Sequence, residues 1–125
     1  MTEATSAFFQ RMLALFPEAR DQYEQLEAAY GTVLETIALE DVFFPHILEL
    51  LQREADVPRL REVFRFFEDV SNSDDPHVLN IFSITILECL GNDQSVLRTA
   101  TKYMGTKTRL LQAEADKSLG RPMRS

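Results

Sequence analysis

Apolar residues in the first 31 positions recur at the three- and four-residue spacing of amphipathic helices. The first such stretch predicts a helix over about 5–15. Pro17 is placed to open a second helix and Gly31 to end it, because Pro fits the first turn of a helix and Gly the residue after its end. The second helix carries an acidic stripe that we interpret as solvated, and its predicted buried face consists of Tyr23, Leu26 and Tyr30.

The pattern over residues 32–40 is ambiguous and fits either a short helix or an extended connector. A third helix is predicted to begin near Asp41, whose side chain is a candidate cap for the N–H groups of the first turn. Pro45 then falls within that turn, where its missing N–H matters little because the first four donors are unpaired anyway. A wide apolar face continues this helix to about residue 54.

Two helices follow in the middle of the chain. The run Asp56-Val57-Pro58 restarts the chain, and clean amphipathic spacing predicts a helix over 57–71. Asp75 and Pro76 supply the cap and the first position of the next helix. That helix runs to Leu90 and is apolar almost all round, so we expect it to be the buried central element.

The C-terminal part predicts two more helices. Either Asn92 or Asp93 caps one that runs to about residue 104, and Thr106 is the candidate cap of another that ends near Gly120. Residues 121–125 are expected to be a frayed tail, which places a single helical domain at 1–120.

These elements predict an all-α fold of six or seven helices in one domain. Strand signals are nearly absent, since alternation of period two is not sustained and no Asn-Gly or Asp-Gly hairpin turn occurs. Short turns predict two consecutive antiparallel hairpins, 41–54 with 57–71 and 76–90 with 93–104. Their repeat length of about 35 residues suits a short solenoid-like stack, and an irregular closed bundle fits nearly as well.

Charge is unevenly distributed along the chain, whose net charge is −7. Residues 1–90 hold 17 acidic against 6 basic residues, whereas 91–125 hold 3 against 7. An acidic body repels nucleic acid and attracts basic partners. The basic end is compatible with an anion contact, although docking on the protein's own acidic body explains it better.

Cys89 is the only cysteine, so no intramolecular disulfide is possible. It lies in an apolar run and is interpreted as a small buried hydrophobe. The N-terminus shows no basic stretch followed by an apolar core, and no apolar run approaches the ~20 residues of a membrane span. A cytoplasmic protein without membrane contact is therefore expected.

No pattern in the chain predicts catalysis or cofactor binding. His46 and Glu49 form a His-x-x-Glu pair, but His77 is followed at the same spacing by Asn80, so a two-helix carboxylate metal site is incomplete. No Gly-x-Ser-x-Gly elbow and no Gly-rich phosphate loop are present. We therefore expect neither metal, nor cofactor, nor enzymatic activity.

Two polar residues interrupt the apolar helix over 76–90. Asn80 and Glu88 stand where burial is expected, and an unpaired buried carboxylate is costly. Glu88 should therefore have a partner, such as Arg65 or a backbone donor, or lie on a groove. A satisfied polar network is the simpler interpretation, and a role in a site is the alternative.

The chain resembles a group of small, acidic, all-α bacterial proteins of uncharacterised function. The resemblance covers about residues 16–91 and consists of Phe16-Pro17-Glu18, Phe67-Glu68-Asp69-Val70, the stretch Ser73 to Asn80, and Ile86-Leu87-Glu88-Cys89-Leu90. Chains of this size and architecture are similar to helical immunity proteins, including those of contact-dependent growth inhibition systems. The resemblance implies a cytoplasmic protein that blocks a toxin.

Charge and resemblance together predict stoichiometric binding of a basic protein partner, specifically a nuclease-type toxin with a cationic cleft. The alternative is a self-associating helical scaffold or regulator, which would form a homodimer. Solubility and helix capping alone also explain part of the acidic clusters. The candidate partner-binding residues are Glu40, Asp41, Phe43, Phe44, Glu49, Glu68, Asp69, Asp74 and Asp75.

Overall fold

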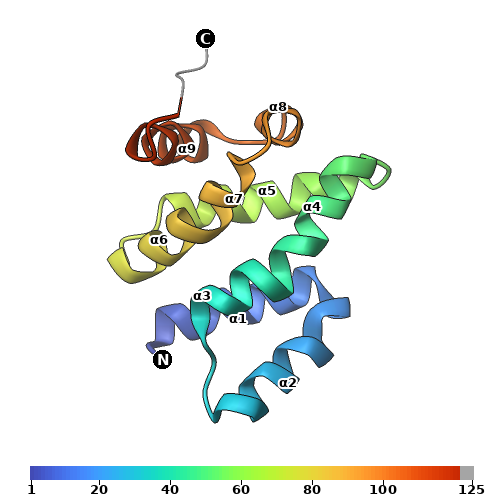
Figure 1. The fold of residues 1–125 in the computed structure, drawn as a ribbon, viewed down its shortest axis with the longest axis vertical. Helices are drawn as coiled ribbons and strands as arrows, with labels where there is room; N and C mark the ends of the chain where they lie inside the picture. Colours follow the sequence, from blue (N-terminus) through green and yellow to red (C-terminus); the bar gives the residue numbers. More distant parts are fainter. Residues whose placement is uncertain (122–125) are drawn as a thin grey trace.

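The computed structural model describes residues 1–121 and shows that the fold is all-α (Figure 1). Over these residues the chain forms seven continuous helices and no strand. Three of the seven join segments of different helical pitch. The segments are α1 (Glu3–Leu15), η1 (Pro17–Ala19) with α2 (Arg20–Tyr30), α3 (Glu35–Ile37) with η2 (Ala38–Phe43) and α4 (Phe44–Arg53), α5 (Val57–Ser71), α6 (Pro76–Phe82) with η3 (Ser83–Leu87) and α7 (Glu88–Leu90), α8 (Gln94–Thr101), and α9 (Thr106–Ser118).

Most helix ends lie where local sequence signals predict them. The carboxylates of Asp56, Asp75 and Asp93 each accept a backbone N–H in the first turn of the helix that follows. Gly31 ends α2 in the left-handed conformation, with φ of 72°, which glycine adopts without steric cost. No helix in the described part of the chain is both long and apolar enough to cross a membrane.

The third helix begins at Glu35, so the predicted start at Asp41 is wrong. Asp41 lies inside the π-helical segment η2, where the N–H of Phe44 donates to the carbonyl of Leu39. Pro45, one residue further on, has no N–H to offer the preceding turn. The widened turn lets the helix pass this proline without a break, and Asp41 faces solvent in mid-helix instead of capping its start.

A core rich in phenylalanine joins the helices from α1 to α9. Phe43 is fully buried, with its ring centroid 6.3 Å from that of Phe9 and 5.9 Å from that of Tyr23, so it cannot be an exposed contact residue as predicted. Phe44 is half-buried against the same core. Tyr30 is 62% exposed, which corrects its predicted burial, because it lies in the last turn of α2.

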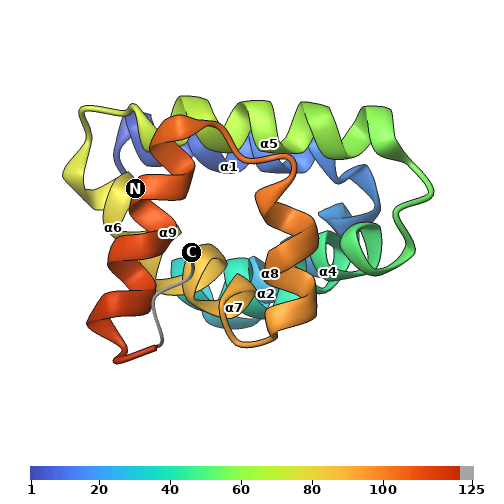
Figure 2. The same ribbon diagram turned by 90° about the horizontal axis from the view of Figure 1, so that it is seen from above.

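The helices pack as an irregular bundle. Partners along the sequence are not the main packing partners: α4 packs on α8, α5 packs on α9, and α1 lies against both α5 and α6. Figure 2 shows α4 and α5 diverging from the loop that joins them, with α8 and α9 stacked over the two rows of helices. The predicted hairpin of 41–54 with 57–71 is therefore not formed as a packed pair, and the closed bundle describes the fold, not a solenoid-like stack.

The helix over 76–90 is central but not fully buried. Phe82, Ile86, Leu87 and Leu90 are inaccessible, whereas Asn80 is exposed and needs no internal partner. Ile84, which sits in the π-helical turn η3, is 40% exposed. The helix therefore has one face exposed to solvent, and this face carries both polar and apolar side chains.

Candidate functional site

The acidic residues predicted to bind a partner do not form one surface. Glu40 and Asp41 lie on η2, Glu49 lies on α4, and the others gather around the turn between α5 and α6. Glu68, Asp75 and Glu49 are engaged in contacts within the chain, whereas Asp69 and Asp74 are exposed.

Glu68 caps a helix distant from it in sequence. Its carboxylate accepts hydrogen bonds from the backbone N–H groups of Lys107 (3.0 Å) and Thr108 (2.9 Å) and from the Thr108 hydroxyl (2.8 Å). Burial alone would raise the pKa of Glu68, but these hydrogen bonds outweigh it and lower the pKa. Glu68 thus replaces Thr106 as the cap of α9 and is removed from the predicted contact set.

Gly105 makes this capping contact possible. A Cβ atom at this position would lie 2.5 Å from the Glu68 carboxyl carbon. A larger residue at position 105 would therefore displace the Glu68 carboxylate from the first turn of α9.

Two more of the predicted residues already have intramolecular partners. The Asp75 carboxylate accepts the N–H of Val78 at 2.9 Å as the cap of α6. Glu49 pairs with Arg53 at 3.2 Å across one turn of α4, with both side chains largely exposed. Asp69 and Asp74 remain exposed near the α5–α6 turn.

The structure brings together an acidic group that the sequence alone does not reveal. Segments η2 and η3 pack on one another, which places Glu40, Asp41 and Glu88 around the half-buried Cys89. We call these three carboxylates the acidic face. Burial raises the pKa of the Cys89 thiol, and the charges of Glu40, Glu88 and Asp41 raise it further, against an opposing effect of Arg121.

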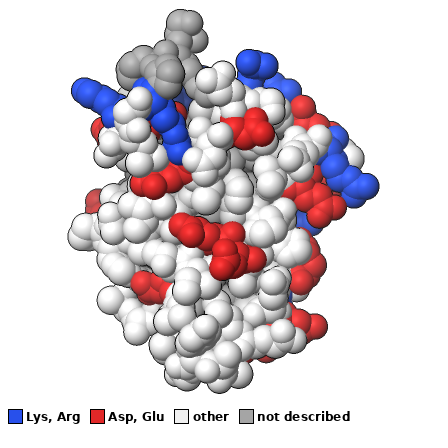
Figure 3. Space-filling view, in the orientation of Figure 1, with Lys and Arg blue, Asp and Glu red and all other residues white. Residues whose placement is uncertain are grey.

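The acidic face is not neutralised internally. Among residues 1–121, none of its three carboxylates takes part in an ion pair. Figure 3 shows acidic side chains in the middle of this side of the molecule, whereas Lys and Arg lie toward its upper part, over α9 and α8 and at the edge near the loop between α4 and α5. Ile84, on η3, and Ile37, at the end of α3, are 40% and 39% exposed, so the same pair of helices also offers aliphatic contact area.

Arg121 is tightly held by side-chain contacts, which corrects its assignment to a frayed tail. Its guanidinium donates to the Asp116 carboxylate at 2.9 Å, to the carbonyl of Glu88 at 3.1 Å and to the side chain of Asn92. A Cβ at Gly91 would lie 2.3 Å from this guanidinium, so a larger residue there would force the Arg121 side chain to move. We call this contact the C-terminal clasp; the rest of the predicted tail, 122–125, lies outside the described residues.

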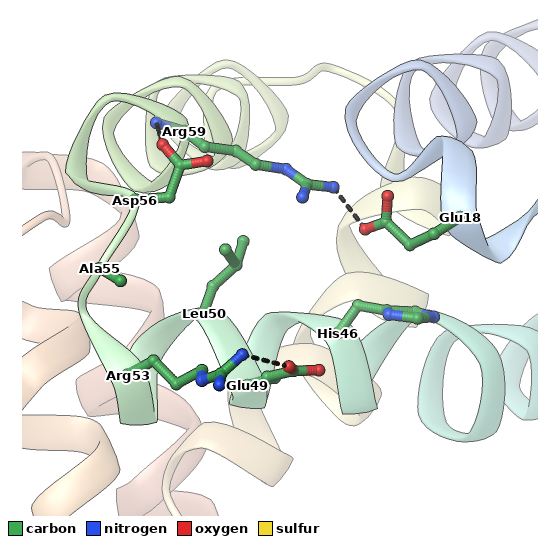
Figure 4. A pocket seen from close by; sticks show the side chains of 8 residues that line it. All are labelled: Glu18, His46, Glu49, Leu50, Arg53, Ala55, Asp56 and Arg59. Atoms are coloured by element: carbon green, nitrogen blue, oxygen red, sulfur yellow. Dashed lines mark hydrogen bonds and ion pairs between the residues drawn. The ribbon is translucent and has the colours of Figure 1, made fainter.

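The pocket in Figure 4 lies between the start of η1, helix α4 and the start of α5 and has a volume of about 400 Å³. Leu50 points into it, and Arg59 reaches across it to Glu18 while also donating to the carbonyl of Leu15. Its other charged groups are equally committed, Glu49 to Arg53 and Asp56 to the cap of α5. The pocket therefore offers no unpaired set of charges to a ligand.

The two histidines have separate structural surroundings. His77 lies 2.7 Å from the Glu35 carboxylate, and His46 stacks on the ring of Phe16 with 6.3 Å between ring centroids. Within residues 1–121, no three His, Cys, Asp or Glu side chains converge in a way that could hold a metal ion.

Fold and surface together define a helical domain whose distinctive exposed feature is an unneutralised acidic face. The chain belongs to the family described as Domain of unknown function (DUF7674), whose model matches residues 9–118. No curated protein and no solved structure matches the chain. The family match spans every helix except the start of α1, and it brings no function with it.

Proposed function

We propose that this protein binds a basic protein partner through the acidic face. The observation that carries the proposal is the convergence of Glu40, Asp41 and Glu88 from two helices, without an internal ion pair for any of them. Like charges brought together raise the electrostatic energy of the folded chain, and a cationic partner relieves it. Ile37 and Ile84 supply apolar contacts on the same helices.

The net charge of −7 supports the same proposal, because a negative field speeds the encounter with a cationic protein. Neutralisation of a nuclease-type toxin in the cytoplasm, the role implied by the resemblance to immunity proteins, is the form of this function that we propose to test. A nuclease needs a cationic cleft for its own substrate, and an acidic protein competes for that cleft.

The test is a pair of charge-reversed variants in capture and binding experiments. The wild-type protein serves as bait, captured proteins are eluted with a salt gradient, and each candidate is then purified and titrated. We expect the Glu40→Lys/Asp41→Lys variant to weaken binding of the true partner at least about tenfold, equivalent to about 1.4 kcal/mol.

The matched control is Glu24→Lys/Glu27→Lys on α2, which changes the net charge equally at two exposed positions. We expect this control to bind nearly as well as the wild type. Equal losses in both variants would show a non-specific charge effect and contradict the proposal. Recovery of only a salt-resistant dimer of the bait would favour the self-associating alternative.

A further inference from the structure

A second charged surface, of opposite sign, lies between α5 and the turn that joins α8 to α9. It is a groove of about 570 Å³. Its lining residues are Arg61, Phe64, Arg65, Glu68, Lys102, Tyr103, Met104 and Gly105. Three cations against one carboxylate make this groove basic in a chain that is acidic overall.

The two arginines of the groove lie on one exposed face of α5. Arg61 and Arg65 are four residues apart on α5, so they share one face of the helix, and like charges at this spacing destabilise a helix. Neither forms an ion pair with any residue of 1–121. Glu62 and Asp69 stand at helical spacing from Arg65, but neither is in ion-pair contact with it, so both guanidinium groups of the pair stay open to solvent.

The other cation of the groove is held in place. Lys102 donates to both oxygens of the Glu54 carboxylate at 3.0 Å, and the Tyr103 hydroxyl donates to the same group at 2.7 Å. Glu54 is the one non-glycine residue of the described chain with positive φ, 47°, at the end of α4. A backbone in this unusual conformation persists where surrounding contacts hold it. The hydrogen bonds to Glu54 are such contacts, and they also hold the Lys102 side chain beside the groove.

The one lining carboxylate is already occupied. Both oxygens of Glu68 accept hydrogen bonds from the first turn of α9, which directs its charge toward that helix end. The guanidinium groups of Arg61 and Arg65 thus remain the uncompensated donors of the groove. A guanidinium binds the oxygens of a phosphate group with two parallel N–H donors.

We propose that this groove is a binding site for a phosphate-bearing small molecule, with Arg61 and Arg65 as the donors, while Lys102 stays paired with Glu54. The site is independent of the acidic face, so either proposal can fail without the other. Phosphate is the recognised group, and the groove next to Tyr103 leaves room for a further part of the ligand.

The experiment is calorimetric titration of the full chain with inorganic pyrophosphate at low salt. We expect saturable binding that weakens with added salt and falls at least about tenfold in the Arg61→Gln/Arg65→Gln variant. The matched control is Arg20→Gln/Lys117→Gln, which removes the same charge from two exposed positions and should lose less than about twofold.

Two further measurements test whether the arginine variant is still folded and whether the groove acts independently of the acidic face. Thermal unfolding of the Arg61→Gln/Arg65→Gln variant should occur near the wild-type temperature, since both side chains are exposed and neither forms an ion pair in the described chain. The Glu40→Lys/Asp41→Lys variant should retain pyrophosphate binding. Absence of saturable binding to the wild type at millimolar pyrophosphate, or an equal loss in the matched control, would overturn the proposal.

Repeating the titration with adenosine diphosphate distinguishes two sources of the phosphate. If adenosine diphosphate binds more tightly than pyrophosphate, the site also contacts the nucleoside, next to Tyr103. Equal affinity would show that the phosphate groups alone are recognised. Loss of both ligands in the arginine variant would support the site in either case.

Discussion

Helices α1 and α9 are of equal length but are attached to the molecule in different ways. Helix α1 buries Phe8, Phe9, Met12 and Leu13 in the aromatic core. Helix α9 buries Thr108, Gln112, Ala115 and Asp116, of which three are polar. Apolar burial tolerates changes in pH and charge, whereas polar docking depends on the geometry and ionisation of each contact. The two ends of the chain should therefore respond differently to substitution and to acid.

The polar docking of α9 is an incomplete network. Gln112 donates to the carbonyl of Leu87 at 2.9 Å and to Asp116 at 3.1 Å, and the hydroxyls of Thr108 and Ser71 lie 2.9 Å apart. The side-chain oxygen of Gln112 is buried without a hydrogen-bond partner in the described chain. An unsatisfied buried acceptor costs about 1–3 kcal/mol, so α9 should be held less firmly than α1.

The largest effect is expected in the aromatic core. Phe43→Ala should lower the free energy of unfolding by about 3–5 kcal/mol, because Phe43 is fully buried among Phe9, Phe16 and Tyr23. Chemical denaturation measures this loss. The half-buried neighbour Phe44, replaced in the same way, is the control and should cost clearly less. Equal losses at both positions would contradict the deeper burial of Phe43.

A smaller loss, confined to α9, is expected at the C-terminal clasp. Gly91→Ala places a Cβ 2.3 Å from the Arg121 guanidinium and 2.4 Å from the Asp116 carboxylate, so the clasp must move. We expect a loss of about 1–3 kcal/mol, typical of a weakened hydrogen bond between charged groups. Amide hydrogen exchange should accelerate in α9 and remain unchanged in α1. In an Arg121→Ala background the same substitution should cost less, and strict additivity of the two changes would contradict the contact.

The sequence was sufficient for the elements whose signals are local. Caps at Asp56, Asp75 and Asp93 and the end at Gly31 depend on residues within one turn, so the helices they bound were predicted closely. The start of the third helix was missed, because the π-helical turn before Pro45 lets a helix continue through a proline signal.

Contacts between distant segments were beyond prediction. Glu68 and α9 are separated by about forty positions, and nothing in the local pattern distinguishes Glu68 from its exposed neighbour Asp69. The grouping of Glu40, Asp41 and Glu88 likewise depends on how η2 packs on η3. The exception is the polar Glu88 in an otherwise apolar helix, which marked that position as unusual from the sequence alone.

Glu68→Gln should lower the free energy of unfolding by roughly 0.5–2 kcal/mol at neutral pH, as expected for a weakened cap. The pKa of Glu68 is lowered in the folded protein, so its contribution is complete above the unfolded value of about 4.3 and is lost as the pH falls through the folded pKa. Denaturation of both proteins between pH 7 and pH 2 should therefore show a difference that shrinks in acid. Asp69→Asn is the matched control, and a difference that does not depend on pH would contradict the charged cap.

The smallest effect concerns the acidic face, and it is measured as the alkylation rate of the Cys89 thiol. The pKa of this thiol is raised by burial and then by Glu40 and Glu88, with a further contribution from Asp41, so little thiolate forms at neutral pH. Glu40→Gln/Asp41→Asn should lower that pKa and increase the rate of alkylation by iodoacetamide at pH 8. The gain is moderate, because a thiolate of lower pKa is also a weaker nucleophile. The matched variant Glu24→Gln/Glu27→Gln on α2 should leave the alkylation rate unchanged, since neither residue contributes to the raised pKa. If both variants accelerate the reaction equally, the net charge of the protein sets the reactivity of the Cys89 thiol. That result would contradict a close-range effect of the η2 carboxylates on its pKa.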